Sequence, residues 1–361
     1  MKSMVRSLRN LARFDRRTEM PEWKGALAVS LVLCTLGLSV SANAQKAIFT
    51  TFDVPGSTST TPKSINPDEA ITGEYRDAVG YPHGFLRARD GTITTFDFPD
   101  ALTTVPVSIN PEGAITGFYY DANHNPHSFL RARDGTFTTV DVPGGLGTTY
   151  PISINPEGEI TGEFDDASAG HGFLRAGDGT FIIFDPPGSL ATKPQSINSK
   201  GDITGYYYNV RSVDGFLRSH DGSFAIIDPP GASSTYPISI NPKGAIAGYY
   251  IGGDDCWHLF LRAPDGTFTT VDPPGLECYW YIPVLTMSIN PEGAITGIFG
   301  GYLGFVFHGF LRGRDGTFIR VDQGSDRLLP VSINPEGAIT GTIPDAGFSH
   351  GFLLRPRSER K

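Results

Sequence analysis

The chain alternates short stretches rich in β-branched and aromatic residues with clusters of turn residues. One such unit contains four candidate strands, at residues 108–110, 114–119, 128–133 and 136–141. Asn110-Pro111 and Asp134-Gly135 lie at the joints, and both sequences favour tight turns, because Pro presets φ and Gly accepts a positive φ. No segment keeps a helical period. The pattern therefore predicts an all-β chain of short antiparallel strands.

The same unit recurs along the chain. Ser-Ile-Asn occurs seven times at spacings of 43 to 49 residues, with its asparagines at Asn66, Asn110, Asn155, Asn198, Asn241, Asn290 and Asn334. A Phe-Leu pair and an Asp that closes a strand follow in the same order, the latter at Asp53, Asp97, Asp141, Asp185, Asp228, Asp272 and Asp322. Four strands in about 44 residues, repeated seven times, predict a seven-bladed β-propeller with four strands per blade. A β-solenoid is the competing architecture, although its coils are usually shorter.

The two ends of the repeat region predict how the propeller closes. An Asp-terminated run, residues 48–53, precedes the first Ser-Ile-Asn, whereas no such run follows the last Phe-Leu strand at Phe352. We therefore expect residues 48–53 to pair with the strand around Phe352 and to complete the seventh blade. This closure by the N-terminal strand would remove the open sheet edges that promote aggregation.

The N-terminal segment has the features of an export signal. An arginine-rich opening leads into an apolar run at residues 26–40, and Ser41-Ala42-Asn43-Ala44 provides a small-x-small cleavage site before Gln45. We therefore predict a signal peptide at 1–44 and a repeat domain at 45–361 that is secreted or periplasmic, with no membrane association after cleavage. A retained N-terminal anchor is the alternative.

Composition limits the function classes. With 39% hydrophobic residues, the chain has enough apolar material for a large core. Its net charge is −9, and without residues 1–44, which carry seven Lys/Arg and three Asp/Glu, 22 basic and 35 acidic residues leave −13. Nucleic-acid binding usually requires a basic surface, so we expect no nucleic-acid partner. We expect a monomer.

Several units resemble a known family. His83-Gly84-Phe85 and His350-Gly351-Phe352, each near a Ser-Ile-Asn-Pro turn and an Ile-Thr-Gly strand, resemble the bacterial extracellular repeats named the HAF family after a His-Ala-Phe triplet. The resemblance covers residues 48–354, with Gly, Ser or Leu where the family has Ala, and with Asp214 in place of His in the fourth unit. It implies an exported, propeller-like protein and no settled reaction.

The recurring histidines predict a structural role. Equivalent positions in different units lie around a ring, whereas zinc ligands must lie within about 2 Å of one ion. His83 falls near the pairing level of Asp97 in its hairpin. We therefore expect a repeated His–Asp hydrogen bond, and we expect no metal and no cofactor.

The strongest departure from the repeat predicts the binding site. The step between the fifth and sixth Ser-Ile-Asn is 49 residues, and its extra length falls in 275–283. Cys256 and Cys278 are the cysteines that follow residue 44, so an exported protein should join them in a disulfide. The candidate binding residues are Trp257, Tyr279, Trp280, Tyr281, Asp254 and Asp255. Aromatic rings on one loop face would form a ligand platform, or the insert only packs over a blade edge.

Two functional hypotheses follow. The first is a secreted, non-catalytic binding or interaction module whose ligand is a glycan or a protein, so carbohydrate is one candidate class. The second is a hydrolase or lyase that acts on a polysaccharide at the propeller mouth, with Asp165, Asp166, Asp254 and Asp255 as candidate acids. The sequence contains no Gly-x-Ser-x-Gly, His-Glu-x-x-His or P-loop signature, which favours the first hypothesis.

Overall fold

The computed structural model describes residues 47–276, 278, 284–300, 307–321 and 327–356. These residues belong to the unit Gln45–Lys361, and their regular elements are all β-strands. Within the described ranges, nothing forms a helix of the length and apolar character needed to cross a membrane. The prediction of an all-β fold is confirmed.

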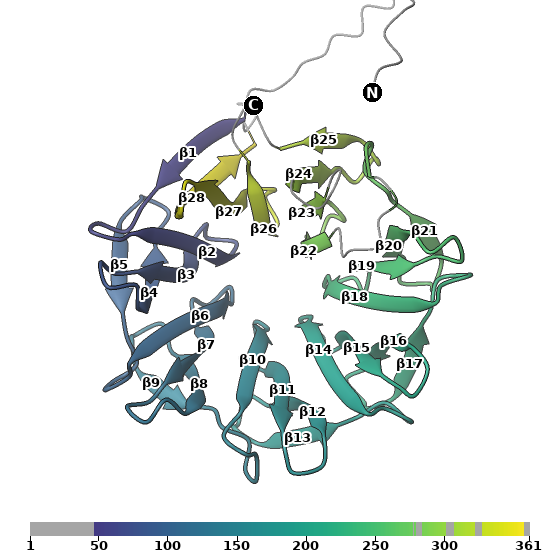
Figure 1. Cartoon of the computed structure of the whole chain (residues 1–361), viewed down its shortest axis with the longest axis horizontal. Coiled ribbons are helices and arrows are strands. Elements are labelled where there is room, and N and C mark those ends of the chain that lie inside the picture. The colour runs from purple at the N-terminus through teal and green to yellow at the C-terminus, as the bar shows by residue number, and fades with distance from the viewer. Residues whose placement is uncertain (1–46, 277, 279–283, 301–306, 322–326, 357–361) are drawn as a thin grey trace, which may run out of the picture. The chain divides into compact units, whose positions relative to one another are not determined.

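The first six sequence repeats each fold into four strands and the seventh into three, and the first two strands contain the Ser-Ile-Asn and Ile-Thr-Gly segments. The first strands are β2 (Ser59–Ile65), β6 (Thr103–Ile109), β10 (Thr149–Ile154), β14 (Ala191–Ile197), β18 (Ser234–Ile240), β22 (Val284–Ile289) and β26 (Leu329–Ile333). The second strands are β3 (Ile71–Arg76), β7 (Ile115–Tyr120), β11 (Ile160–Asp165), β15 (Ile203–Tyr208), β19 (Ile246–Ile251), β23 (Ile295–Gly300) and β27 (Ile339–Asp345). Within Gln45–Lys361, Figure 1 places the first strands innermost.

The third and fourth strands lie progressively further from the centre. The third strands are β4 (Pro82–Arg87), β8 (Pro126–Arg131), β12 (Gly170–Arg175), β16 (Val213–Arg218), β20 (Trp257–Arg262), β24 (Phe307–Arg312) and β28 (Phe348–Arg355). The fourth strands are β5 (Ile93–Phe96), β9 (Phe137–Thr139), β13 (Phe181–Phe184), β17 (Phe224–Ile227), β21 (Phe268–Thr270), β25 (Phe318–Arg320) and β1 (Ile48–Phe52). We number the resulting units one to seven after their Ser-Ile-Asn strands.

Antiparallel pairing joins the four strands of each unit. Three sheets have four strands, and two have eight because a single parallel bridge joins neighbouring units, at Gly170–Ala191 and at Ser59–Ser349. The loop between second and third strands and the connection between units therefore lie on one side, which we call the loop side. The Asn-Pro and Asp-Gly turns lie on the opposite side, which we call the turn side.

The first strand of the chain belongs to the last sequence repeat. β1 pairs antiparallel with β28, with Thr51 opposite Phe352, which confirms the pairing predicted for residues 48–53. Phe52 is buried and its ring lies 6.1 Å from that of Phe85. β1 therefore contributes both backbone pairing and core packing.

The repeated asparagines of the Ser-Ile-Asn segments link each unit to the next. In the second unit, the Oδ1 of Asn110 accepts a hydrogen bond from the backbone N–H of Ala114 at 2.8 Å, which holds the turn. The Nδ2 of Asn110 donates to the backbone oxygen of Asn155 at 3.1 Å. The same donation runs through the asparagines Asn66, Asn110, Asn155, Asn198, Asn241, Asn290 and Asn334 and returns to Asn66. We call this closed set of hydrogen bonds the asparagine ring; the sequence predicts the turn contact but not this contact between units.

The core lies between successive units. Ile109, Ile115 and Phe129 of the second unit pack with Leu86 and Phe96 of the first. Phe129 and Ile115 are fully buried. Each sheet therefore stabilises its neighbour, because its apolar face is removed from water only when the next sheet is present.

Removing one member of the asparagine ring should destabilise the fold. Asn241→Ala eliminates the bonds to Ala245 N and Asn290 O; the Ala245 N–H loses its acceptor, whereas Asn290 O keeps the bond from the Gly293 N–H. We expect the free energy of unfolding to fall by about 2–3 kcal/mol in urea titrations. Asn125→Ala, at an exposed loop asparagine, is the matched control and should change it by no more than about 0.5 kcal/mol. Equal effects of the two variants would contradict a special role for the ring.

Deleting residues 45–53 tests the contribution of β1. The deletion exposes the edge of β28 and removes the buried ring of Phe52. Loss of a buried Phe side chain destabilises by about 3–5 kcal/mol, so we expect the melting temperature to fall by about 10 °C or more. An unchanged melting curve in differential scanning calorimetry would show that β1 does not stabilise the seventh unit.

Candidate functional site

The predicted disulfide is present. Cys256 lies in the loop between β19 and β20, and Cys278 lies after β21, with their Cα atoms 4.9 Å apart. The disulfide therefore ties a loop-side turn of the fifth unit to the start of the long connection. The candidate aromatics Tyr279, Trp280 and Tyr281 lie outside the described residues.

Trp257 does not form an exposed platform, contrary to the sequence prediction. Its side chain is only 7% exposed. It is the first residue of β20 and pairs with Ile251, so it is part of the sheet and not of a free loop. Its ring lies 5.6 Å from that of Tyr236 and 5.4 Å from that of Tyr249. Trp257 therefore supports other aromatic side chains.

Asp254 and Asp255 form the turn before the disulfide. The carboxylate of Asp254 accepts a hydrogen bond from the Cys256 backbone N–H at 3.1 Å and lies 3.3 Å from His258 Nε2. The Cys256 N–H, followed by His258, lowers the pKa of Asp254. Asp255 is exposed, with a φ of 61° that suits an Asp in a turn. Asp254 is therefore ionised and orients the His258 ring.

The repeated His–Asp hydrogen bond is confirmed in five units. The distances from histidine Nδ1 to the carboxylate are 3.0 Å for His83–Asp97, 2.6 Å for His127–Asp141, 2.7 Å for His171–Asp185, 2.7 Å for His258–Asp272 and 2.9 Å for His350–Asp53. In the last pair, Asp53 follows β1, so this contact also holds the N-terminal strand. Asp322 of the sixth unit lies outside the described residues.

A second carboxylate faces the Nε2 of four of these histidines. The partners are Asp77 at 3.6 Å, Asp121 at 3.7 Å, Asp166 at 3.3 Å and Asp254 at 3.3 Å. Burial disfavours protonation of His171 and His258, but their two carboxylates outweigh it and raise both pKa values. The repetition of this arrangement in unit after unit indicates a structural role.

The other pair of candidate acids is also explained by local structure. Asp166 accepts hydrogen bonds from the Ser168 hydroxyl and N–H and from the Ala169 N–H. These bonds, led by the Ser168 hydroxyl, lower the pKa of Asp166. Asp165 is exposed at the end of β11. Across the described ranges, no group of three or more His, Cys, Asp or Glu residues is placed to hold a metal ion.

The second strands contain a variable surface that the sequence analysis missed. Side chains at the first and third positions after the glycine of each second strand lie on one face, because strand residues alternate. We call them the loop-end row: Glu74, Arg76, Phe118, Tyr120, Glu163, Asp165, Tyr206, Tyr208, Tyr249, Ile251, Ile298, Gly300, Thr342 and Pro344. The residues between them are uniformly bulky, mostly aromatic. The sequence does contain a signal for this surface: in the second strands, every other residue differs between units while the residues between them stay bulky.

The loop-end row of one unit meets the first strand of the next. Phe118 lies 5.6 Å from Tyr150, measured between ring centroids. Glu163 forms a salt bridge with Lys193 at 2.8 Å. These contacts join side chains of different units into a surface of mixed chemistry on the loop side.

The densest part of this surface is a tyrosine cluster between the fourth and fifth units. The ring centroid of Tyr206 lies 5.1 Å from that of Tyr236 and 5.9 Å from that of Tyr208. Tyr236 stacks on Tyr249 at 5.0 Å. The side chain of Tyr208 is 41% exposed. We define the tyrosine cluster as Tyr206, Tyr208, Tyr236 and Tyr249, with Trp257 beneath it.

Three tyrosine hydroxyls of this cluster, those of Tyr206, Tyr236 and Tyr249, are held in the neutral form. Burial, followed by the neighbouring Tyr236 and Tyr208 hydroxyls, raises the pKa of Tyr249 to about 12. Burial also raises the pKa values of Tyr206 and Tyr236. Neutral phenols both donate and accept hydrogen bonds, so the cluster offers apolar ring faces with polar edges.

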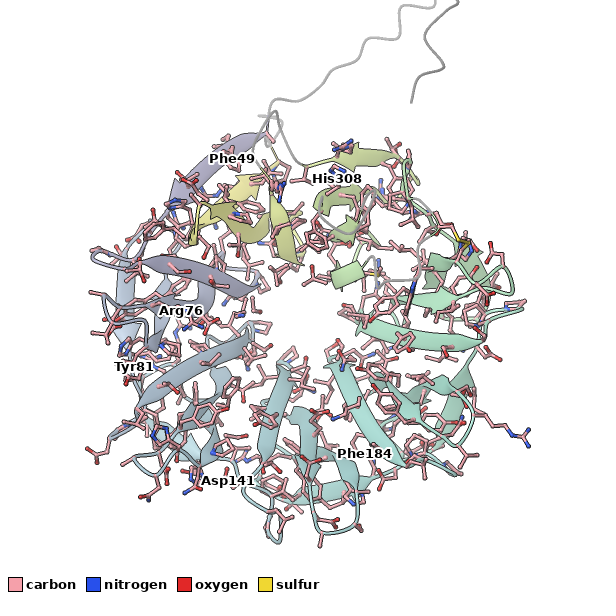
Figure 2. The ribbon with its side chains drawn as sticks, in the orientation of Figure 1. Phe49, Arg76, Tyr81, Asp141, Phe184 and His308 are labelled. Atoms are coloured by element: carbon pink, nitrogen blue, oxygen red, sulfur yellow. A yellow bond between two sulfur atoms is a disulfide. The ribbon has the colours of Figure 1, made fainter. Side chains whose placement is uncertain are left out.

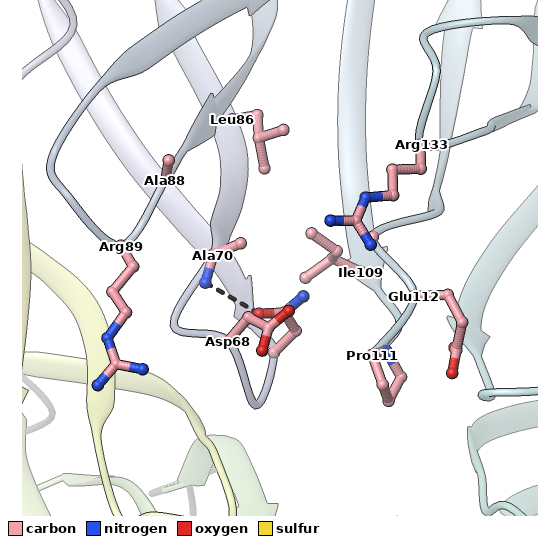
Figure 3. Close-up of a pocket in the computed structure, with 11 residues that line it drawn as sticks. Asp68, Ala70, Leu86, Ala88, Arg89, Ile109, Pro111, Glu112 and Arg133 are labelled. Carbon is pink, nitrogen blue, oxygen red and sulfur yellow. Dashed lines mark hydrogen bonds between the residues drawn. The ribbon is translucent and has the colours of Figure 1, made fainter.

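Two cavities lie between the first and second units. The one on the turn side has a volume of about 340 Å³, and Figure 3 shows Arg89 and Arg133 on its two walls with Asp68 and Glu112 nearby. Two basic and two acidic side chains thus balance one another there. The other cavity, on the loop side, has a volume of about 420 Å³. It contains the loop-end row of both units.

Comparison with known proteins gives the fold. No family model and no curated protein matches the sequence. A streptogramin B lyase aligns with a TM-score of 0.57 at 16% identity, over 86% of this chain and 98% of the lyase. A catalytically inactive virginiamycin B lyase from Staphylococcus aureus with quinupristin gives a TM-score of 0.59 at 12% identity, over 85% and 99%. Peptide-bound YCF48 gives 0.50 at 12% identity, over 86% and 97%. At these identities the likeness shows a β-propeller fold alone.

The neutral tyrosines predict a loss of stability at alkaline pH. An unfolded chain ionises its tyrosines near pH 10, whereas Tyr249 in the folded protein keeps its proton to about pH 12. Between these values the folded state binds more protons, so the free energy of unfolding falls as the pH rises. Tyr249→Phe should flatten this fall in urea titrations at about pH 9 and about pH 11. Tyr81→Phe, at an exposed ring, is the control; an equal slope in both variants would refute the assignment.

Proposed function

We propose that this protein is a secreted, non-catalytic carbohydrate-binding module on a closed seven-bladed propeller. Two contacts support closure: Asn334 donates to the oxygen of Asn66, and β1 pairs with β28. The disulfide between Cys256 and Cys278 supports export, because oxidising compartments favour disulfides. A rigid ring of this kind holds its loop side in a fixed arrangement for a ligand.

The tyrosine cluster is the observation that carries the proposed function. Aromatic faces stack on the C–H groups of sugar rings, and phenol hydroxyls bond to sugar hydroxyls, so tyrosines suit a carbohydrate ligand. Tyr208 is exposed, while Tyr236 and Tyr249 are fixed by stacking on each other and by packing against the Trp257 ring. Ligand binding at a preordered surface loses little side-chain entropy.

A polysaccharide hydrolase or lyase is the less supported alternative. Such an enzyme needs a carboxylic acid or base that is free to exchange a proton with substrate. Asp166 and Asp254 instead belong to repeated histidine contacts, and local hydrogen bonds keep both ionised. The lyases among the structural neighbours are too distant to transfer an activity.

Replacing Tyr208 tests the proposed function. Tyr208→Ala removes an exposed ring without opening the core, so we expect an unchanged melting temperature. Binding to a glycan found on an array with residues 45–361 should weaken by about tenfold or more, as for an interface hot spot. Phe348→Ala removes a similarly exposed aromatic ring at 55% exposure from the seventh unit and is the matched control.

Three outcomes would overturn the proposal. These are an array with no bound glycan, a Tyr208→Ala variant that binds like the parent protein, and a Phe348→Ala variant that loses binding equally. Turnover of a bound polysaccharide that Asp254→Asn abolishes would replace the binding module with the enzyme.

A further inference from the structure

The loop-side cavity between the first and second units combines an aromatic wall with charged groups. Phe118 and Tyr120 of β7 form part of one side, and Glu74 and Arg76 of β3 face it. In Figure 2, Arg76 is labelled between the first and second sheets. The volume of about 420 Å³ is in the range of small-ligand sites. These four residues occupy the positions that Tyr206 and Tyr208 occupy in the fourth unit.

Arg76 has a positive charge that no carboxylate pairs with among the residues that the structure describes. Its guanidinium donates one hydrogen bond to the backbone oxygen of Gly80 at 2.8 Å, which orients the side chain. The neighbouring cation, Lys63, is paired with Glu74 at 3.4 Å. The cavity therefore holds a neutral ion pair beside an oriented cation with donors to spare.

A second feature of the cavity is a hydroxyl without a partner. The Oγ1 of Thr103, which lines the cavity, is buried and has no hydrogen-bond partner. At the equivalent position, the Ser59 hydroxyl bonds to Ser349, and the Thr148 hydroxyl accepts from the Asp165 N–H. A buried polar group without a partner is destabilising, so we infer that the Thr103 side chain rotates toward the cavity and that its hydroxyl gains a partner when a ligand binds.

We propose that this cavity is a second sugar subsite, specific for a residue that carries a carboxylate, such as a hexuronate. Arg76 would bind the carboxylate, because a guanidinium matches that group in geometry and charge. The Lys63–Glu74 pair would donate to and accept from ring hydroxyls, and Thr103 would bond to another. The proposal rests on the proposed function, since it assigns a ligand class to the same binding surface.

The charge of the protein limits the kind of acidic glycan. Residues 45–361 carry a net charge of −13, so a densely charged polyanion is repelled at long range. Arg76 is the cavity's cation without a carboxylate partner among the described residues, so it can neutralise one carboxylate of a ligand. The preferred ligand is therefore a glycan in which single uronate residues are separated by neutral sugars, and the neutral sugars meet the tyrosine cluster.

A pair of small probes tests the subsite. Methyl glucuronide and methyl glucoside differ in a carboxylate and a hydroxymethyl group, so their affinities isolate recognition of the charge. By ligand-observed NMR titration of residues 45–361, we expect the glucuronide to bind about tenfold or more tightly than the glucoside. Arg76→Gln should abolish that preference, whereas Arg314→Gln, at an exposed arginine on the turn side, should retain it.

Thr103→Val separates a ligand contact from a structural role. Valine keeps the shape of the side chain and removes the unpartnered hydroxyl, so the free energy of unfolding should stay the same or rise. Affinity for the glucuronide should fall several-fold. A loss of stability with unchanged affinity would show that the hydroxyl belongs to the fold and would overturn its assignment.

Further outcomes separate this subsite from the tyrosine cluster. Tyr208→Ala should still bind methyl glucuronide, and Arg76→Gln should still bind a neutral oligosaccharide. The proposal for each site can therefore be refuted independently of the other. Equal affinity for the two glycosides, or no binding of the glucuronide, would overturn the subsite. Tighter binding of N-acetylphenylalanine than of the glucuronide would show that the cavity recognises a peptide-like carboxylate and would overturn the sugar assignment.

Discussion

The asparagine ring is the constraint on which the rest of the structure depends. Each of its side chains uses Oδ1 to hold its own turn and Nδ2 to bond to the next unit, as Asn110 does with Ala114 and Asn155. These groups are buried, so each must find its partner inside the protein. A single residue type therefore fixes the turn geometry and the distance between neighbouring sheets at the same time. The seven units share this asparagine and differ from one another at other positions.

The loop side contains several of these differences. The turn side of every unit is fixed by the ring, and in the first six units also by an Asp-Gly hairpin, while the middle of each sheet packs on its neighbour. The loop-side ends of the first two strands are anchored at their other end by the asparagine turns, and several of their side chains are partly exposed. The tyrosine cluster and the Arg76 cavity both lie there. Rigid strands that present variable side chains give a more exact arrangement than loops do.

Features that recur in every unit can be predicted from the sequence. Features that distinguish one unit from another, on which a binding site would depend, cannot. Turns, the β1 pairing and the His83–Asp97 contact follow from spacing, since one unit explains seven. The contact of Tyr206 with Tyr236 joins different units and leaves no local pattern. Trp257 was wrongly placed because a residue beside Cys256 resembles a loop residue, whereas pairing with Ile251 makes it the start of a strand.

The long connection is linked to the tyrosine cluster through its disulfide and the buried ring of Trp257. Its disulfide fixes Cys256 in the turn directly before Trp257, and Trp257 packs against Tyr236 and Tyr249. The loop that departs from the repeat is thus connected, through one bond and one buried ring, to the aromatic surface of the repeat itself. Fixing a tyrosine before a ligand arrives removes an entropy loss of about 0.5–1.5 kcal/mol per side chain from the binding step. Under the proposed function, the disulfide at Cys256 would therefore aid binding by ordering the aromatic surface through Trp257.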